Sequence, residues 1–245
     1  MPKNFKPQET ELSITTPLNF DAQAIPIHEV CTDQPKVLAH HLDPSILKHR
    51  FQNPPVWQPE ITDENRHVIA ADIISKRQAA GKVTRAAVLI PLLMKKDGLS
   101  VLLTQRTDHL HDHAGQISFP GGRMDPSDFD PNHTALRESE EEIGLNPQGV
   151  EIIGHLPQYL TVSGYSVTPV VGLVKPQAEY ALDAFEVADV FEVPLHFLMD
   201  PANHQVRVWE SDQGSRRFYS MPYENRFIWG ATAGMLRNLY HLLKV

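Results

Sequence analysis

Acidic side chains crowd one short stretch of this sequence, Arg137-Glu-Ser-Glu-Glu-Glu142. Hard divalent cations prefer oxygen ligands, and Mg²⁺ is typically held by one or two carboxylates together with the phosphates of a substrate. A bare run of glutamates is also what a solvated helix face looks like, so the neighbouring residues must decide between the two interpretations. The chemistry that this stretch offers is the binding of Mg²⁺ or Mn²⁺ beside a phosphate group.

The flanking residues predict a helix that presents these carboxylates. Asp130-Pro131 gives a capping residue followed by proline at the first helical position, and Gly144 supplies a stop, which together bracket a helix of about 13 residues. At about 100° per residue, Glu138, Glu141 and Glu142 share one arc about 100° wide, whereas Glu140 should face water. The positions expected to be buried are Ala135, Leu136, Ser139 and Ile143.

Three carboxylates on one helix face need compensation. Like charges at i and i+4, such as Glu138 and Glu142, destabilise a helix by roughly 0.2–0.5 kcal/mol, and a bound cation would offset this. Arg137 lies one turn before Glu141 and should pair with it, which orients the cluster. The preceding Gly121-Gly122 permits backbone angles forbidden to other residues and a close approach to a ligand. These features together favour a metal-dependent site over a solvated face.

The spacing of these residues resembles the Nudix box of the Nudix hydrolases, a family that cleaves nucleoside diphosphates linked to another moiety. The positions that match the motif are Gly122, Asp128, Arg137, Glu138, Glu141, Glu142, Gly144 and Leu145. The sequence departs from the motif in three ways. Asp128 replaces a glutamate, eight residues instead of seven separate it from Arg137, and Ser139 occupies a position that is usually aliphatic.

The resemblance implies a hydrolase that uses Mg²⁺ or Mn²⁺ as its cofactor. The implied catalytic residues are Arg137, Glu138, Glu141 and Glu142, and the three glutamates are the implied metal ligands, or one of them helps to activate water. The reaction would be attack of water on one phosphorus of a diphosphate. Glu141 and Glu186 are both candidates for the general base, and the sequence leaves that choice open.

Further segments are similar to the coenzyme A pyrophosphatase branch of that family, and the resemblance covers about residues 45–243. They are Leu102-Leu-Thr-Gln-Arg-Thr-Asp-His-Leu110, His113-Ala-Gly-Gln-Ile-Ser-Phe-Pro-Gly-Gly122, Val167–Gly172, Glu186-Val187, Phe191–Leu195 and Ile228–Ala233. This implies cleavage of coenzyme A or an acyl-CoA to 3′,5′-ADP and (acyl-)4′-phosphopantetheine. The alternatives are a Nudix hydrolase of ADP-ribose, NADH or dinucleoside polyphosphates, and a non-catalytic nucleotide-sensing domain.

The branch signature supplies the candidate substrate-binding residues, which are Arg106, His113, Gln116, Gly121 and Gly122. An arginine suits a phosphate because its guanidinium is planar and can donate two hydrogen bonds at once. His113 ends an alternation of histidines that begins at His109, but without a Cys or Glu partner this is a weak pattern for zinc.

The pattern of strands and helices that must position these residues predicts a mixed-sheet α/β (α+β) fold. The resemblance implies a Nudix-like α/β/α sandwich with a mixed β-sheet and a catalytic loop-helix. We expect a proline-rich N-terminal arm over 1–42, a helical lead-in segment over 43–82 and a Nudix hydrolase domain over 83–245. Helices are predicted over 44–51, 63–80 and 231–243, and strands over 86–94, 99–104, 150–156, 167–174, 187–193, 205–210 and 216–221.

Composition excludes several classes of protein. The formal charge is −8, with 22 Lys and Arg against 30 Asp and Glu, which does not suit sequence-independent nucleic-acid binding. The sequence shows neither a signal peptide nor a membrane-spanning apolar run, so we expect a cytoplasmic protein. The single cysteine, Cys31, excludes an internal disulfide. The expected partner is a small-molecule diphosphate substrate, and the sequence is compatible with a homodimer without fixing the oligomeric state.

Overall fold

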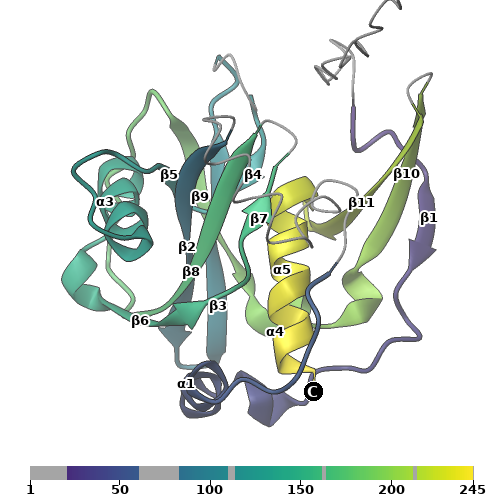
Figure 1. The fold of residues 1–245 in the computed structure, drawn as a ribbon, viewed down its shortest axis with the longest axis horizontal. Coiled ribbons are helices and arrows are strands. Elements are labelled where there is room, and N and C mark those ends of the chain that lie inside the picture. The colour runs from purple at the N-terminus through teal and green to yellow at the C-terminus, as the bar shows by residue number, and fades with distance from the viewer. Residues whose placement is uncertain (1–20, 61–82, 110–113, 162–163, 212–213, 245) are drawn as a thin grey trace, which may run out of the picture.

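The computed structural model describes residues 21–60, 83–109, 114–161, 164–211 and 214–244 (Figure 1). The helix predicted over 63–80 and the first twenty residues of the predicted arm lie outside these ranges. Within the described ranges, no helix is long and apolar enough to cross a membrane.

An eight-stranded mixed sheet lies at the centre of the fold. Its strands are β2 (Thr84–Lys95), β3 (Gly98–Arg106), β4 (Ile117–Ser118), β5 (Gly121–Arg123), β6 (Val150–His155), β7 (Tyr159–Leu160), β8 (Tyr165–Val174) and β9 (Val187–Pro194). β2 pairs with β8 in parallel and with β3 and β5 antiparallel. The predicted hairpin is therefore confirmed, as are the strands predicted over 150–156, 167–174 and 187–193.

Helices cover both faces of this sheet, which is why its central strands read as nearly continuous apolar runs. α3 (Pro131–Ile143) packs on one face and α5 (Gly230–Leu243) on the other (Figure 1). The shorter helices are α1 (Pro44–Gln52), α4 (Leu195–Leu198) and the 3₁₀ turns η1 (Ala39–Leu42), η3 (Pro147–Gly149) and η4 (Pro201–Asn203). The predicted helices at 44–51 and 231–243 and the predicted helix–sheet–helix sandwich are confirmed.

A second, four-stranded antiparallel sheet adds a layer outside α5 (Figure 1). Its order is β1 (Ile27–Val30), β10 (Gln205–Ser211), β11 (Gly214–Tyr223) and β12 (Arg226–Trp229). The strands predicted over 205–210 and 216–221 form, but the sequence did not reveal that they build a sheet of their own. β1 comes from the predicted arm. The segment just before it is held by buried Arg207 of β10, which donates hydrogen bonds to the carbonyls of Gln23 and Ile25.

A buried arginine on α5 joins distant segments of the chain. The Arg237 side chain is fully buried, and its guanidinium donates to Glu60 at 3.0 and 2.7 Å and to Gln34 at 2.9 Å. A further nitrogen lies 2.9 Å from His204 Nδ1. Although burial acts to raise the pKa of Glu60, its hydrogen bonds with His241 and Arg237 hold that pKa at about 2. The cation therefore fixes residues 34 and 60 against the C-terminal helix.

Replacing Arg237 should test how much this cluster contributes to stability. Arg237→Ala leaves the Glu60 carboxylate partly buried without its cation, and we expect the free energy of unfolding to fall by about 3 kcal/mol. Lys36→Ala is the matched control, because Lys36 pairs with Asp200 while its own side chain is 70% exposed. That change should cost at most about 0.5 kcal/mol. Urea unfolding of both variants measures the difference, and equal losses would contradict the role given to Arg237.

Candidate active site

The local sequence explains where α3 begins and ends. The Asp130 side chain accepts a hydrogen bond from the His133 amide at 2.8 Å, and Pro131 occupies the first helical position. Gly144 ends the helix in the left-handed conformation, with φ 64°, which glycine adopts without steric cost. The helix boundaries predicted from the sequence are therefore confirmed.

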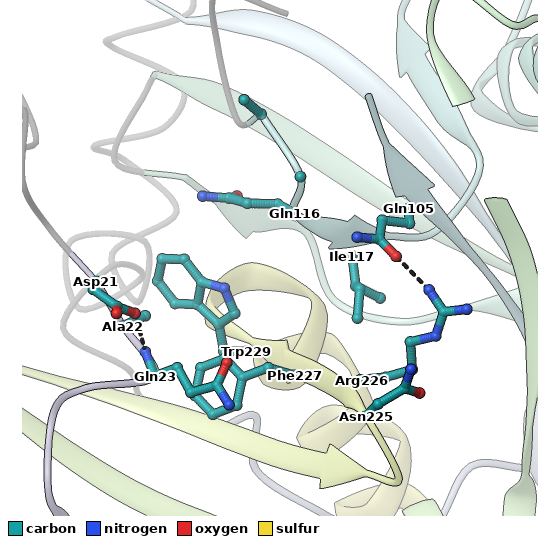
Figure 2. A pocket seen from close by; sticks show the side chains of 12 residues that line it. Asp21, Ala22, Gln23, Gln105, Gln116, Ile117, Asn225, Arg226, Phe227 and Trp229 are labelled. Atoms are coloured by element: carbon teal, nitrogen blue, oxygen red, sulfur yellow. Dashed lines mark hydrogen bonds between the residues drawn. The ribbon is translucent and has the colours of Figure 1, made fainter. Parts of the chain in front are cut away.

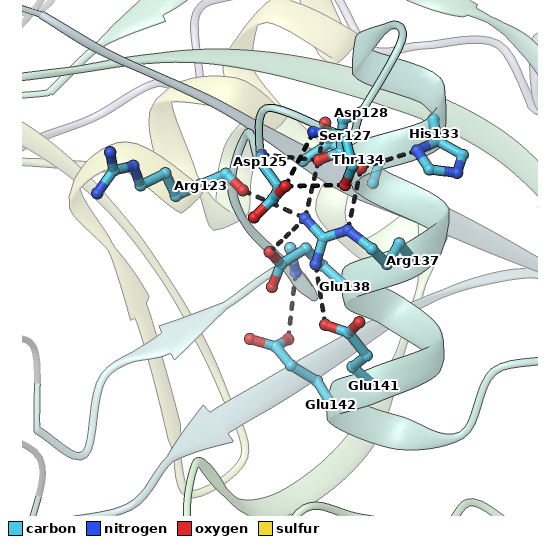
Figure 3. Close-up of polar contacts among 12 residues, drawn as sticks. Arg123, Asp125, Ser127, Asp128, His133, Thr134, Arg137, Glu138, Glu141 and Glu142 are labelled. Atoms are coloured by element: carbon cyan, nitrogen blue, oxygen red, sulfur yellow. Dashed lines mark hydrogen bonds and ion pairs between the residues drawn. The ribbon is translucent and has the colours of Figure 1, made fainter.

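A buried ion pair fixes the face of α3 that carries the glutamates (Figure 3). The Asp128 side chain is fully buried and accepts hydrogen bonds from Arg137, from Nε at 3.0 Å and from Nη2 at 2.8 Å. The Thr134 hydroxyl also donates to it, at 2.9 Å. These hydrogen bonds, led by those from Arg137, hold the pKa of Asp128 well below its usual range. Asp128 is therefore the anchor for Arg137, a role that sequence reasoning did not assign to it.

Arg137 also holds two of the glutamates. Its Nη1 lies 2.9 Å from Glu141 Oε2, which confirms the predicted i,i+4 pair, and its Nη2 lies 2.9 Å from Glu138 Oε1. The Glu141 side chain is 60% exposed. Glu140 is also exposed, as predicted from the helical period, and it points away from this cluster. The phase of the predicted helix is therefore correct.

Other groups of the chain lie close to both glycines of the loop. A side chain at Gly122 would place Cβ 2.4 Å from Glu138 Oε2, and one at Gly121 would lie 2.5 Å from the carbonyl oxygen of Ala87. The Gly121 amide donates to Glu142 Oε2 at 3.1 Å. The groups that lie against this loop are therefore groups of the chain itself, and the predicted close approach to a ligand stays a prediction.

The pKa values of Glu138 and Glu142 are raised, which indicates that too little positive charge lies near these carboxylates. Glu142 is 6% exposed, and burial raises its pKa to about 8. Burial also raises the pKa of Glu138, despite the opposing effect of Arg137. The negative charge of Glu186 also acts to raise the pKa of both. Buried Glu142 and half-buried Glu138 offer carboxylate oxygens, the ligand type that hard cations prefer.

The donor set fits a divalent cation that a substrate helps to bind. Across the described ranges, no three or more His, Cys, Asp and Glu side chains are already arranged to hold a metal ion. Mg²⁺ commonly keeps one or two protein carboxylates and takes its remaining ligands from water and substrate phosphates. Glu138 and Glu142 can supply that number, so the residues fit the implied ion.

The other predicted substrate-binding residues lie around the end of β3. The Nε atom of Arg106 is buried and has no hydrogen-bond partner among the described residues, and its charge lowers the pKa of Glu142. The Arg106 amide donates a hydrogen bond to the Gln116 carbonyl at 2.9 Å. Gln116 also lines a pocket described below. The Thr107 amide donates to the Glu186 carbonyl at 3.1 Å and so joins the two segments. His113 lies outside the described residues.

Comparison with known proteins gives consistent similarities. A family model described as the NUDIX domain matches residues 83–213. A protein of Yersinia pestis (strain Pestoides F) called "Uncharacterized Nudix hydrolase NudL" is 43% identical over 155 residues, which are 63% of this chain and 77% of that protein. A protein of the same name from Yersinia pseudotuberculosis serotype O:3 (strain YPIII) has the same identity and coverage.

Solved structures are similar at lower identity. A C. elegans Ap4A hydrolase in a binary complex is 22% identical, with a TM-score of 0.41, over 49% of this chain and 86% of that one. The Nudix hydrolase RenU of M. smegmatis is 21% identical, with a TM-score of 0.40, over 46% of this chain and 71% of that one.

The buried ion pair predicts a pH-dependent effect on stability. Arg137→Ala leaves Asp128 buried without its cation, and we expect a loss of about 2–3 kcal/mol at pH 7. Because the folded-state pKa of Asp128 is lowered, the pair stabilises the protein above the ordinary carboxyl pKa, and that contribution is lost as pH falls towards the folded value. The loss should therefore be smaller at pH 3, which lies below the ordinary carboxyl pKa.

Urea unfolding at the two pH values measures this, with Arg123→Ala as the control. Arg123 is exposed, and only its backbone carbonyl accepts a hydrogen bond from Arg137, so its truncation should change stability by less than about 0.5 kcal/mol. An Arg137→Ala loss that is the same at both pH values would contradict the assigned pairing.

Proposed function

The chain belongs to the Nudix hydrolase family, and we propose that this diphosphate-cleaving enzyme acts on coenzyme A or an acyl-CoA. The products would be 3′,5′-ADP and (acyl-)4′-phosphopantetheine. The family membership gives the hydrolysis of a diphosphate substrate, and the choice of substrate is our proposal. The observation that carries it is the segment 102–122, whose sequence resembles the coenzyme A branch and which ends at the glycines that contact Glu138 and Glu142.

Three glutamates are proposed to hold Mg²⁺ or Mn²⁺. Glu138 and Glu142 are the principal ligands in this proposal, since both are substantially buried and face the Gly121-Gly122 loop. Glu141 completes the set or serves as a general base, and Glu186 is the alternative base. Such an ion, when bound, neutralises charge on the phosphate oxygens and lowers the pKa of water.

The residues of the chain itself have complementary roles in this proposal. Arg137, anchored by Asp128, orients Glu138 and Glu141. Arg106 has a buried guanidinium nitrogen without a protein partner among the described residues, and its charge lowers the pKa of Glu142, so it is the proposed contact for a substrate phosphate. Catalysis of phosphoryl transfer rests largely on such positioning and electrostatic stabilisation.

Amide substitutions on α3 test the assigned glutamates. Glu138→Gln and Glu142→Gln should each lower kcat by about 100-fold or more, because a carboxylate–metal platform supplies several kcal/mol to the transition state. Glu140→Gln is the matched control and should be nearly silent, since Glu140 points into solvent. Diphosphate hydrolysis with Mg²⁺ or Mn²⁺ is the measurement, and EDTA should abolish wild-type turnover. An equal loss in Glu140→Gln would refute the assignment.

Substrate preference tests the choice of coenzyme A. We expect kcat/KM for coenzyme A or an acyl-CoA to exceed that for ADP-ribose, NADH or a dinucleoside polyphosphate, measured side by side with product identification. In Arg106→Ala, KM should rise more than kcat falls, because a phosphate contact that is equal in ground and transition states affects binding. A preference of about tenfold for ADP-ribose would leave the diphosphate chemistry intact and reject coenzyme A. Absence of turnover on every diphosphate would favour a nucleotide-sensing domain.

A further inference from the structure

A separate pocket of about 370 Å³ is lined by Trp229, the residue before α5, and α5 packs on the face of the large sheet opposite α3. Three parts of the chain build it: the arm before β1, the ends of β3 and β4, and the β12 hairpin. The lining residues that bear on its chemistry are Asp21, Gln105, Gln116, Arg226, Phe227 and Trp229 (Figure 2). Its size is within the range usual for small-molecule sites.

The pocket is joined to the glutamate site through two short segments. Gln105 lines the pocket, and the charge of the next residue, Arg106, lowers the pKa of Glu142; the pairing of β3 with β9 is irregular between these two residues. Gln116 and Ile117 line the pocket, and the same segment continues to Gly121, whose amide bonds to Glu142. The end of β3 and the segment from Gln116 to Gly121 therefore connect the pocket to the glutamate site along the chain.

The charges around the pocket do not favour a phosphate. Arg226 is already paired with Asp189 and Gln105, and its guanidinium stacks on Phe191 at 4.5 Å from the ring centroid. Asp21 adds a negative charge to the opposite wall. Among the described residues, the lining thus has no surplus positive charge, unlike a site built for a polyanion.

The pocket instead combines aromatic surface with amide groups. Figure 2 shows the indole of Trp229 between the Asp21–Gln23 segment and Gln116, with the ring of Phe227 below it. Aromatic rings stack on the faces of nucleobases, and amide and carboxylate groups hydrogen-bond to their edges. A planar, uncharged heterocycle satisfies both features.

We propose that this pocket binds the nucleobase of the diphosphate substrate, with Trp229 as the stacking surface. The inference rests on the proposed function to the extent that it assumes a nucleotide substrate, and it does not require that substrate to be coenzyme A. The arm takes part in recognition, because Arg207 holds the carbonyls of Gln23 and Ile25 and so fixes the wall that contains Asp21.

Calorimetric binding of two probes tests the base contact apart from turnover. The probes are AMP and ribose 5-phosphate, which share the sugar phosphate and differ in the base. Wild-type protein should bind AMP about 10-fold or more tightly than ribose 5-phosphate, and Trp229→Ala should remove most of that advantage. Trp209→Ala is the matched control, because Trp209 lies on β10 with Arg216 over its ring and does not line the pocket. It should leave both affinities unchanged.

The paired variants Trp229→Phe and Trp229→Leu keep the test decisive if Trp229→Ala fails to fold. Phenylalanine retains an aromatic face and should retain more of the AMP preference than leucine. Equal AMP binding by wild type and the Trp229 variants, or equal binding of the two probes by wild type, overturns the nucleobase assignment. Trp229-dependent AMP binding in a protein that does not hydrolyse coenzyme A supports the pocket and rejects only the proposed substrate. Hydrolysis of coenzyme A by a protein whose AMP binding does not depend on Trp229 supports the proposed substrate and rejects the nucleobase pocket.

Discussion

The Asp128–Arg137 ion pair is the interaction on which the arrangement of the glutamates depends. A carboxylate that is fully buried must be paired, and Asp128 meets this requirement with two guanidinium nitrogens. The same arginine contacts Glu138 and Glu141, so the pair sets the position of the loop and the orientation of the helix face at once. The loop before α3 and the helix therefore behave as one unit.

That unit gathers negative charge at a cost to stability. Glu142 is almost completely buried, and its burial, together with the charges of Glu138 and Glu186, raises its pKa to about 8. A protein selected for stability alone would not retain such a group, because burial of a carboxylate without a cation is unfavourable. Such perturbed groups are characteristic of functional sites. The glycine loop permits the crowding, since a Cβ at Gly122 would lie 2.4 Å from Glu138 Oε2 and the carboxylate would have to move.

α5 supports the rest of the molecule by contacting two sheets. Its residues share one core with the large sheet and with Met221 and Ile228 of the smaller sheet. The buried Arg237 connects it to residues 34 and 60, so segments far apart in the chain meet on one helix. The pocket beside Trp229 exists only because the arm, the large sheet and the β12 hairpin all converge at the start of this helix.

The sequence by itself determined the local features of this protein. Asp130-Pro131 and Gly144 located α3, the helical period separated exposed Glu140 from the other glutamates, and apolar runs located the main strands. These predictions were correct because caps, periodicity and turns act between residues that are neighbours in the chain. The Nudix resemblance then identified the chemistry, because its motif lies within one continuous segment.

Tertiary structure decided the features that need distant partners. β1 is four residues long and owes its pairing to β10, which lies about 180 residues later in the chain. The burial of Asp128, the loss of solvent around Glu142 and the second sheet likewise depend on how separate segments pack. Burial and its effect on pKa are properties of the assembled environment, so no local pattern in the sequence could have specified them.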